Sequence, residues 1–266
     1  MEHHQLPVPS RGCESCHGPG SRHVQARGSR KQILRVGVKL EPEQSLPNSG
    51  DHIVGYRGLS PEQSRQSSQY CLSCHNRQTH FNWAGGQHDM QGVSCVDCHN
   101  PMKATPHLLR QQEPELCYAC HPERRAQANY PSHHPIEEGQ ILCSDCHNQH
   151  GSNTQAMLRA DTTNELCYQC HAEKEGPFTF EHSPVSESCA NCHEPHGTVA
   201  NNLLRETEPF LCLGCHTGHQ GAIAPLNDVV ETGPKAATFY TKCTQCHSTI
   251  HGTDLPSTSG HGRFTR

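Results

Sequence analysis

Residues 143–171 read CSDCHNQHGSNTQAMLRADTTNELCYQCH. This stretch holds two Cys-x-x-Cys-His motifs, one beginning at Cys143 and the other at Cys167. All 18 cysteines of the 266-residue chain fall into nine such motifs, so no cysteine is left over. The nine cysteine pairs are Cys13 and Cys16, Cys71 and Cys74, Cys95 and Cys98, Cys117 and Cys120, Cys143 and Cys146, Cys167 and Cys170, Cys189 and Cys192, Cys212 and Cys215, and Cys243 and Cys246. The histidines that directly follow them are His17, His75, His99, His121, His147, His171, His193, His216 and His247.

Cys-x-x-Cys-His is the attachment motif of c-type haem. The two thiols add to two vinyl groups of the porphyrin, and the histidine then binds the iron from one side. Zinc ribbons also use Cys-x-x-Cys, but they have no use for a histidine after each pair. A disulfide scaffold would not keep one spacing nine times, and a redox dithiol normally occurs once. The motifs therefore predict nine covalently bound c-type haems, with each motif histidine as the proximal ligand of its iron.

The composition agrees with a chain held together by cofactors. Leu, Ile, Val and Phe make up about 15% of the residues, below the roughly 20% of a chain with an ordinary hydrophobic core. The formal charge of −5 excludes a nucleic-acid binder held by a basic surface. No apolar run reaches the 18 or more residues of a transmembrane helix. With 22 glycines and 19 prolines, we expect a mostly irregular chain with short α-helices and almost no β-structure.

The motifs belong to a longer repeat. First motifs beginning at Cys95, Cys143, Cys189 and Cys243 alternate with second motifs beginning at Cys117, Cys167 and Cys212. A matching piece lies between the two motifs of a repeat: Leu108-Leu109-Arg110, Met157-Leu158-Arg159 and Leu203-Leu204-Arg205. We therefore expect tandem two-haem modules over residues 91–266, stacked in an elongated array. Residues 1–90 form an N-terminal haem segment that contains a polar loop, 26–69, and the whole chain is expected to be one continuous multihaem domain.

The occupant of the second axial position of a haem separates electron carriers from ligand-binding enzymes. Extra histidines recur near the first motif of each module, either before it or after it. Those before it are His88, His134 and His182, and those after it are His107, His150, His196 and His251. His23 and His80 are available for the first two haems, which makes nine distal candidates for nine irons. His4, which shares the upstream register, and His133, the neighbour of His134, are weaker candidates.

Four segments carry a resemblance to a known family. They are the run Gly12–Gly20 around the first motif, Asn82-Trp83-Ala84-Gly85, the Glu-Leu-Cys-Tyr repeats, and Ile250-His251-Gly252. Together they resemble the periplasmic decahaem cytochromes of the MtrA/DmsE type. The resemblance implies a wire of bis-histidine haems that sits in, or docks to, a porin-like β-barrel of the outer membrane. It also implies a periplasmic or inner-membrane cytochrome as donor, and an outer-surface multihaem cytochrome, a molybdenum reductase of the dimethyl-sulfoxide type or a mineral as acceptor.

The chain departs from this family in two ways. It has nine motifs rather than ten, and Met1–Pro7 has neither the basic nor the apolar region of an export signal. Because c-type haem is attached outside the cytoplasm, we expect an exported protein. The resemblance implies that it lies on the periplasmic side of the outer membrane or within the barrel. The simplest interpretation is that a front end carrying the signal and a tenth motif is missing, and the alternative is a protein that genuinely binds nine haems.

Two other functions stay open. A multihaem reductase of the nitrite or hydroxylamine type would need one iron with an open distal position, and no motif here departs from Cys-x-x-Cys-His to mark one. A filament-forming cytochrome would need an assembly surface that nothing in the sequence marks. The prediction is therefore an electron carrier rather than an enzyme. The resemblance implies that it serves extracellular or dimethyl-sulfoxide-type respiration, or the oxidation or reduction of metals.

Overall fold

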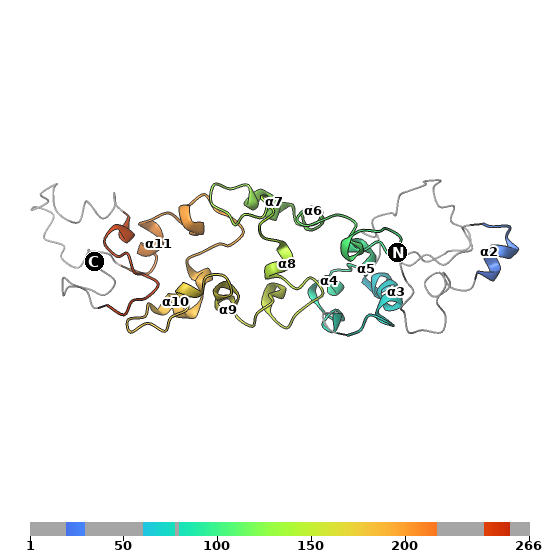
Figure 1. The fold of residues 1–266 in the computed structure, drawn as a ribbon, viewed down its shortest axis with the longest axis horizontal. Coiled ribbons are helices and arrows are strands. Elements are labelled where there is room, and N and C mark those ends of the chain that lie inside the picture. Colours follow the sequence, from blue (N-terminus) through green and yellow to red (C-terminus); the bar gives the residue numbers. More distant parts are fainter. Residues whose placement is uncertain (1–19, 30–60, 78–79, 217–241, 256–266) are drawn as a thin grey trace, which may run out of the picture. The chain divides into compact units, whose positions relative to one another are not determined.

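A computed structural model describes residues 20–29, 61–77, 80–216 and 242–255 of the chain (Figure 1). The described α-helices are short: α2 (Ser21–Gln25), α3 (Pro61–Leu72), α4 (Gln87–Met90), α5 (Cys95–Cys98), α6 (Glu115–Tyr118), α7 (Pro122–Ala128), α8 (Cys143–Cys146), α9 (Thr163–Tyr168), α10 (Ser183–Glu187) and α11 (Phe210–Leu213). Single 3-10 turns are η3 (Pro106–Leu108), η4 (Gln155–Met157), η5 (Ala172–Lys174), η6 (Cys189–Asn191), η7 (Asn201–Leu203) and η10 (Cys243–Gln245). Across these ranges the only β-structure is a set of isolated bridges, such as His99 to Leu109 and His193 to Leu204. The predicted class, short helices with almost no β-structure, is confirmed.

Each haem-attachment motif among the described residues, from Cys71 onward, folds as one helical turn. The backbone N–H of the motif histidine donates to the carbonyl of the first cysteine, at 2.9 Å in the motif of Cys95 and at 2.9 Å in that of Cys189. The same bond measures 2.8 Å at Cys71 and 2.8 Å at Cys243. Residues three apart share a helix face, so the turn places both thiols of a motif on one side with the histidine directly after them.

The Leu-Leu-Arg pieces form a second recurrent element. In η3, η4 and η7 two consecutive residues adopt left-handed backbone, for example Ala156 (φ 57°) and Met157 (φ 55°). The loop is closed on its own motif by two backbone bonds, which in the third repeat run from Glu194 to Leu203 (2.8 Å) and from Arg205 to Cys192 (2.9 Å). The first and second repeats make the equivalent bonds, with Asn100 donating to Leu108 and Asn148 donating to Met157 at 2.7 Å each. The sequence repeat is therefore also a repeat of backbone geometry.

The chain divides into two compact units. One unit contains Met1–Leu116 and His147–Met157, and the other contains Cys117–Cys146 and Leu158–Arg266. The division at residue 90 that the sequence suggests stays a prediction. No helix among the described residues has the length and apolar character needed to cross a membrane.

One expectation was wrong. Residues 61–69, assigned to the polar loop 26–69, form most of the helix α3. Pro61 opens this helix at its first position, where a missing N–H costs nothing. The helix buries serines instead of aliphatic residues: the Ser64 hydroxyl donates to the carbonyl of Gly92 at 2.6 Å, and the Cys95 N–H donates to the Ser68 hydroxyl at 3.4 Å. A helix that buries serine lacks the apolar stripe by which amphipathic helices are recognised.

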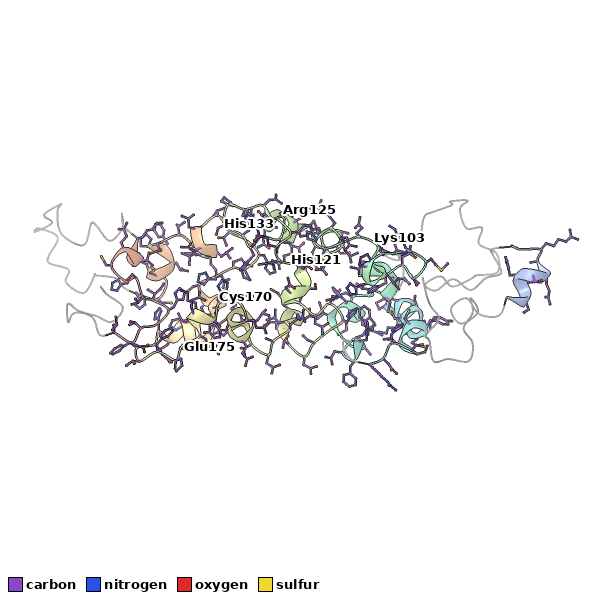
Figure 2. All side chains as sticks on the ribbon, viewed as in Figure 1. Lys103, His121, Arg125, His133, Cys170 and Glu175 are labelled. Carbon is purple, nitrogen blue, oxygen red and sulfur yellow. The ribbon has the colours of Figure 1, made fainter. Side chains whose placement is uncertain are left out.

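The protein core is small. Among the described residues, the buried apolar side chains are Trp83, Val96, Tyr118, Ala128 and Ala200. Figure 2 shows the side chains of the described part of the chain as sticks on the ribbon. Five buried apolar side chains cannot offset the conformational entropy of so long a chain, which fits the expectation that haem supplies the missing apolar material.

Candidate haem-binding site

Five pairs of imidazole rings face each other at nearly the same separation. Ring centres lie 6.1 Å apart in the pair His75 and His80, 6.0 Å in His99 and His150, and 6.3 Å in His134 and His171. They lie 6.0 Å apart in His182 and His216, and 6.1 Å in His193 and His251. Each pair joins one motif histidine to one predicted distal ligand.

This separation can be compared with that of two imidazoles on opposite faces of one iron. A metal–imidazole nitrogen bond is about 2.0–2.1 Å long, and the ring centre lies about 1.1 Å behind the nitrogen. Two ligands in line with one iron therefore have ring centres about 6.2 Å apart. All five pairs match this value within about 0.2 Å. The residues present therefore fit a haem iron between each pair.

Four of the five pairs follow two rules of connectivity, whereas the fifth joins His75 to a histidine only five residues later, His80. A motif histidine of a first motif pairs with the histidine that follows the first motif of the next module, as in His99 with His150 and His193 with His251. A motif histidine of a second motif pairs with the histidine upstream of the first motif of its own module, as in His171 with His134 and His216 with His182. Neighbouring modules thus share sites, an arrangement that the spacing of histidines did not reveal.

Hydrogen bonds orient the rings of the motif histidines. Nδ1 of three first-motif histidines donates to a carbonyl in the left-handed turn of the same module, that of His107, Ala156 or Asn202. The distances are 2.9 Å for His99, 2.8 Å for His147 and 2.9 Å for His193. Because a carbonyl only accepts, the proton is on Nδ1 and the lone pair of Nε2 is available for a metal.

The upstream histidines are oriented by the next module. His88, His134 and His182 donate from Nδ1 to the carbonyl of the residue just before His150, His196 and His251, respectively. These acceptors are Gln149 at 3.0 Å, Pro195 at 2.8 Å and Ile250 at 3.1 Å. The short segments around His150, His196 and His251 therefore each provide one candidate ligand and orient a second one, the upstream histidine, through a backbone carbonyl.

A glycine directly follows each of His150, His196 and His251. At the first two positions this glycine lets its segment lie close to the backbone of another segment in the same unit. Gly151 has φ +106° and Gly197 has φ +143°, both in the region that glycine favours. A Cβ at Gly151 would collide with the carbonyl of Asn82, and one at Gly197 with the carbonyl of Gln127. Any other residue at these two positions would push the segment that carries His150 or His196 away from the backbone that it packs against.

Burial keeps several of these rings neutral. Burial lowers the pKa of His150 to about 4, with the neighbouring His80 adding to the effect. Burial also lowers the pKa of His99 and of His251. A ligand must present an unprotonated nitrogen, so at neutral pH these rings are ready to bind a metal without first losing a proton.

The thiols of consecutive motifs also meet. A hydrogen bond from Cys71 lowers the pKa of Cys95 to about 7, against the opposing effect of burial. Burial and the neighbouring Cys189 raise the pKa of Cys167 to about 12, and burial with Cys243 does the same for Cys212. In each case the two thiols that touch would attach two different haems. Adjacent attachment sites therefore lie side by side within each unit.

Other predicted ligands lie in different surroundings. His107 occupies the turn position of Ala156 and Asn202 rather than the register of His150, and its ligand role stays a prediction. Nδ1 of His23 bonds the carbonyl of Ser29 at 2.9 Å, and His133 contacts Glu138 through Nε2 at 3.1 Å. Cys13, Cys16, His17 and His4 lie outside the described residues.

Trp83 belongs to the site although the sequence marked it only as part of a resemblance. Its ring is buried, 6.4 Å from that of His150, and among the described residues its indole N–H has no acceptor. Burying an N–H without a partner costs about 1–3 kcal/mol. A haem propionate is an acceptor of the required kind.

Repeated attachment turns, paired imidazoles and the few buried apolar side chains of the described residues define a multihaem c-type cytochrome, and so an electron-transfer protein. Comparison with protein families agrees: a model described as a doubled CXXCH motif matches residues 88–126, 133–176 and 182–221. Each match begins at or next to an upstream histidine, which confirms the two-haem module. The chain is also 36% identical over 256 residues to the multihaem cytochrome MtrA of Shewanella baltica (strain OS185), covering 94% of this chain and 70% of that protein. The chain therefore belongs to the MtrA family of multihaem cytochromes.

Proposed function

We propose that this cytochrome is an electron conduit whose nine haems are all held by two histidines. The five ring pairs at 6.0–6.3 Å carry this proposal. Bound haem supplies one-electron chemistry at iron and passes electrons to the neighbouring haem. A site with an imidazole on both faces has no position for a substrate, which favours a carrier over a reductase.

The chain contributes attachment, ligation and close spacing. The motif cysteines hold the cofactors, and the histidines at the registers of His134 and His150 close the second face of each iron. We assign the same role to the remaining candidates: His23, His88, His107 and His196. In one unit the rings of His80 and His150, which belong to two different pairs, have centres only 4.2 Å apart. Ligands in contact and thiols in contact place neighbouring sites within short transfer distance.

The proposed route runs between the periplasm and the cell surface. The family relationship supports an exported protein that works at the outer membrane with a porin-like barrel. A periplasmic or inner-membrane cytochrome would be the donor, and a surface multihaem cytochrome, a molybdenum reductase or a metal the acceptor.

Spectroscopy and co-purification test the proposal. Carbon monoxide added to the reduced holoprotein should leave the Soret band unchanged, and the ferric protein should lack a high-spin resonance. A barrel expressed with the cytochrome should be retained on a tagged form of it. A stoichiometric high-spin signal that binds nitrite or hydroxylamine would instead support the reductase. A monomeric cytochrome that never binds a barrel would contradict the conduit.

A further inference from the structure

The three histidines that follow a first motif differ in what surrounds them. Two residues before each stands a polar side chain: Asn148 before His150, Glu194 before His196, and Thr249 before His251. Asn148 and Glu194 occupy the same backbone position, since the N–H of each donates into the left-handed turn of its module. Each also accepts the backbone N–H of its histidine, at 3.2 Å for Asn148 and 3.4 Å for Glu194.

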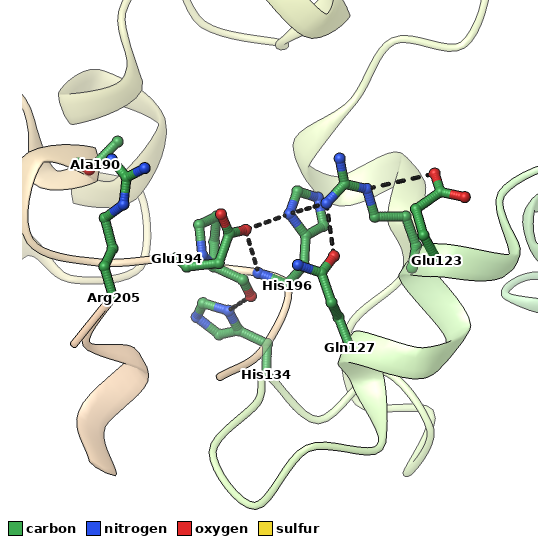
Figure 3. A network of polar contacts seen from close by, with 9 residues as sticks. Glu123, Gln127, His134, Ala190, Glu194, His196 and Arg205 are labelled. Carbon is green, nitrogen blue, oxygen red and sulfur yellow. Dashed lines mark hydrogen bonds and ion pairs between the residues drawn. The ribbon is translucent and has the colours of Figure 1, made fainter. Parts of the chain in front are cut away.

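Unlike Asn148, Glu194 also contacts the ring of the histidine two residues later. Its Oε1 lies 2.8 Å from Nδ1 of His196 (Figure 3). By contrast, the described Nδ1 contacts of His88, His99, His134, His147, His182 and His193 are to backbone carbonyls. Two motif histidines also have a carboxylate near Nδ1, but at longer distances: Glu123 lies 3.4 Å from His121, and Glu173 lies 4.0 Å from His171. A charged acceptor makes a hydrogen bond roughly twice as strong as a neutral one.

This contact also settles which nitrogen of His196 faces a metal. An ionised carboxylate only accepts, so Nδ1 carries the proton and Nε2 has the free lone pair. The guanidinium of Arg124 lies 3.5 Å from the same Nδ1 and donates to Gln127 at 2.6 Å (Figure 3). Since an N–H cannot accept from Arg124, this cation acts only as a nearby charge and offsets part of the carboxylate's effect.

We propose that Glu194, through its hydrogen bond to Nδ1 of His196, lowers the reduction potential of the haem iron that His196 binds below those of the irons bound by His150 and His251. A carboxylate on Nδ1 pulls the proton toward itself and makes Nε2 a more basic ligand. A more basic ligand stabilises ferric iron over ferrous iron, so that haem accepts an electron less readily. The inference rests on the proposed axial role of His196.

The test is a redox titration of the holoprotein followed by optical and electron paramagnetic resonance spectra. Glu194→Gln keeps the shape of the side chain and replaces the charged acceptor with a neutral one. One component of the titration, one haem in amplitude, should move to higher potential. We expect the ratio of oxidised to reduced haem to change about tenfold, the lower end of outer-shell effects on metal sites, which is about 59 mV for a one-electron couple. One low-spin ferric signal should shift while the others stay.

Two variants serve as controls. Glu206→Gln removes the same charge at an exposed position next to Arg205, and should move no component by a comparable amount. Asn148→Glu places a carboxylate in the same register beside His150 and should lower the potential of one haem. Equal shifts in Glu194→Gln and Glu206→Gln would overturn the proposal, because the effect would then be one of overall charge.

The ligand assignment is checked separately with His196→Ala. One high-spin haem in this variant, together with unchanged potentials in Glu194→Gln, would refute the tuning role alone. No high-spin haem in His196→Ala would refute the assignment of His196, and the tuning role with it.

Discussion

Replacing His251 with alanine is the sharpest perturbation of a single pair. The His251 ring is half-buried, and its centre lies 6.1 Å from that of His193, the separation expected for two ligands of one iron. The substitution removes five ring atoms from one face of the site. The vacated volume exceeds the roughly 30 Å³ that a water molecule occupies, so water or carbon monoxide can reach the metal.

The expected stoichiometry is one. The reduced variant should bind one carbon monoxide per protein, which is one haem in nine if all nine motifs are loaded. Its ferric form should show one high-spin signal that the wild type lacks. His133→Ala is the matched control, because His133 contacts Glu138 rather than a motif histidine, and it should stay entirely low-spin. Absence of a new site in His251→Ala, or an equal response in His133→Ala, would refute the pairing drawn from ring geometry.

Four further outcomes are expected. The intact mass should exceed that of the polypeptide by nine haems, and acid–acetone should not extract them. The haem-free chain should show no cooperative melting, because the described residues bury few apolar side chains. A sharp melting transition of the haem-free chain would contradict this expectation. Gly197→Ala should cost about 1–3 kcal/mol in backbone strain and produce partial high-spin haem. Gly139→Ala is the control, because Gly139 also has a positive φ (+69°) but nothing lies within 4 Å of the new Cβ, and it should keep a low-spin spectrum. Equal spectra of the two variants would refute the importance of the close contact between Gly197 and the Gln127 carbonyl. Arg159→Ala removes a 2.8 Å hydrogen bond to the carbonyl of Ser144 and should lower the free energy of unfolding by about 1 kcal/mol, measured by denaturant titration, with Lys103→Ala as an exposed control expected to have no effect. His182→Ala should also create one high-spin haem, because His182 faces His216 at 6.0 Å, and an unchanged spectrum would refute that pair.

Much of the site could be read from the chain. The spacing of Cys95, Cys98 and His99 already specified a haem attached by two thiols and ligated by the next residue, because that chemistry is local to five residues. The repeated Leu-Leu-Arg or Met-Leu-Arg pieces revealed the two-haem module, because each piece forms a turn that bonds to the motif a few residues before it. The helix over 61–72 was missed, since serines such as Ser64 on its buried face carry no hydrophobic period.

Sequence alone determined the cofactor, the number of attachment motifs and the set of candidate ligands, since covalent attachment and its proximal histidine depend on neighbours in the chain. Only the tertiary structure decided which imidazole faces which. His99 and His150 lie in different modules, and no local pattern states that the turns around them bring their rings to 6.0 Å. The same holds for the carboxylate of Glu194, whose neighbour on the chain is the motif histidine His193 but whose oxygen bonds the ring of His196. Axial pairing and outer-shell hydrogen bonds depend on how the chain folds back on itself, and for that reason only the folded structure decides them.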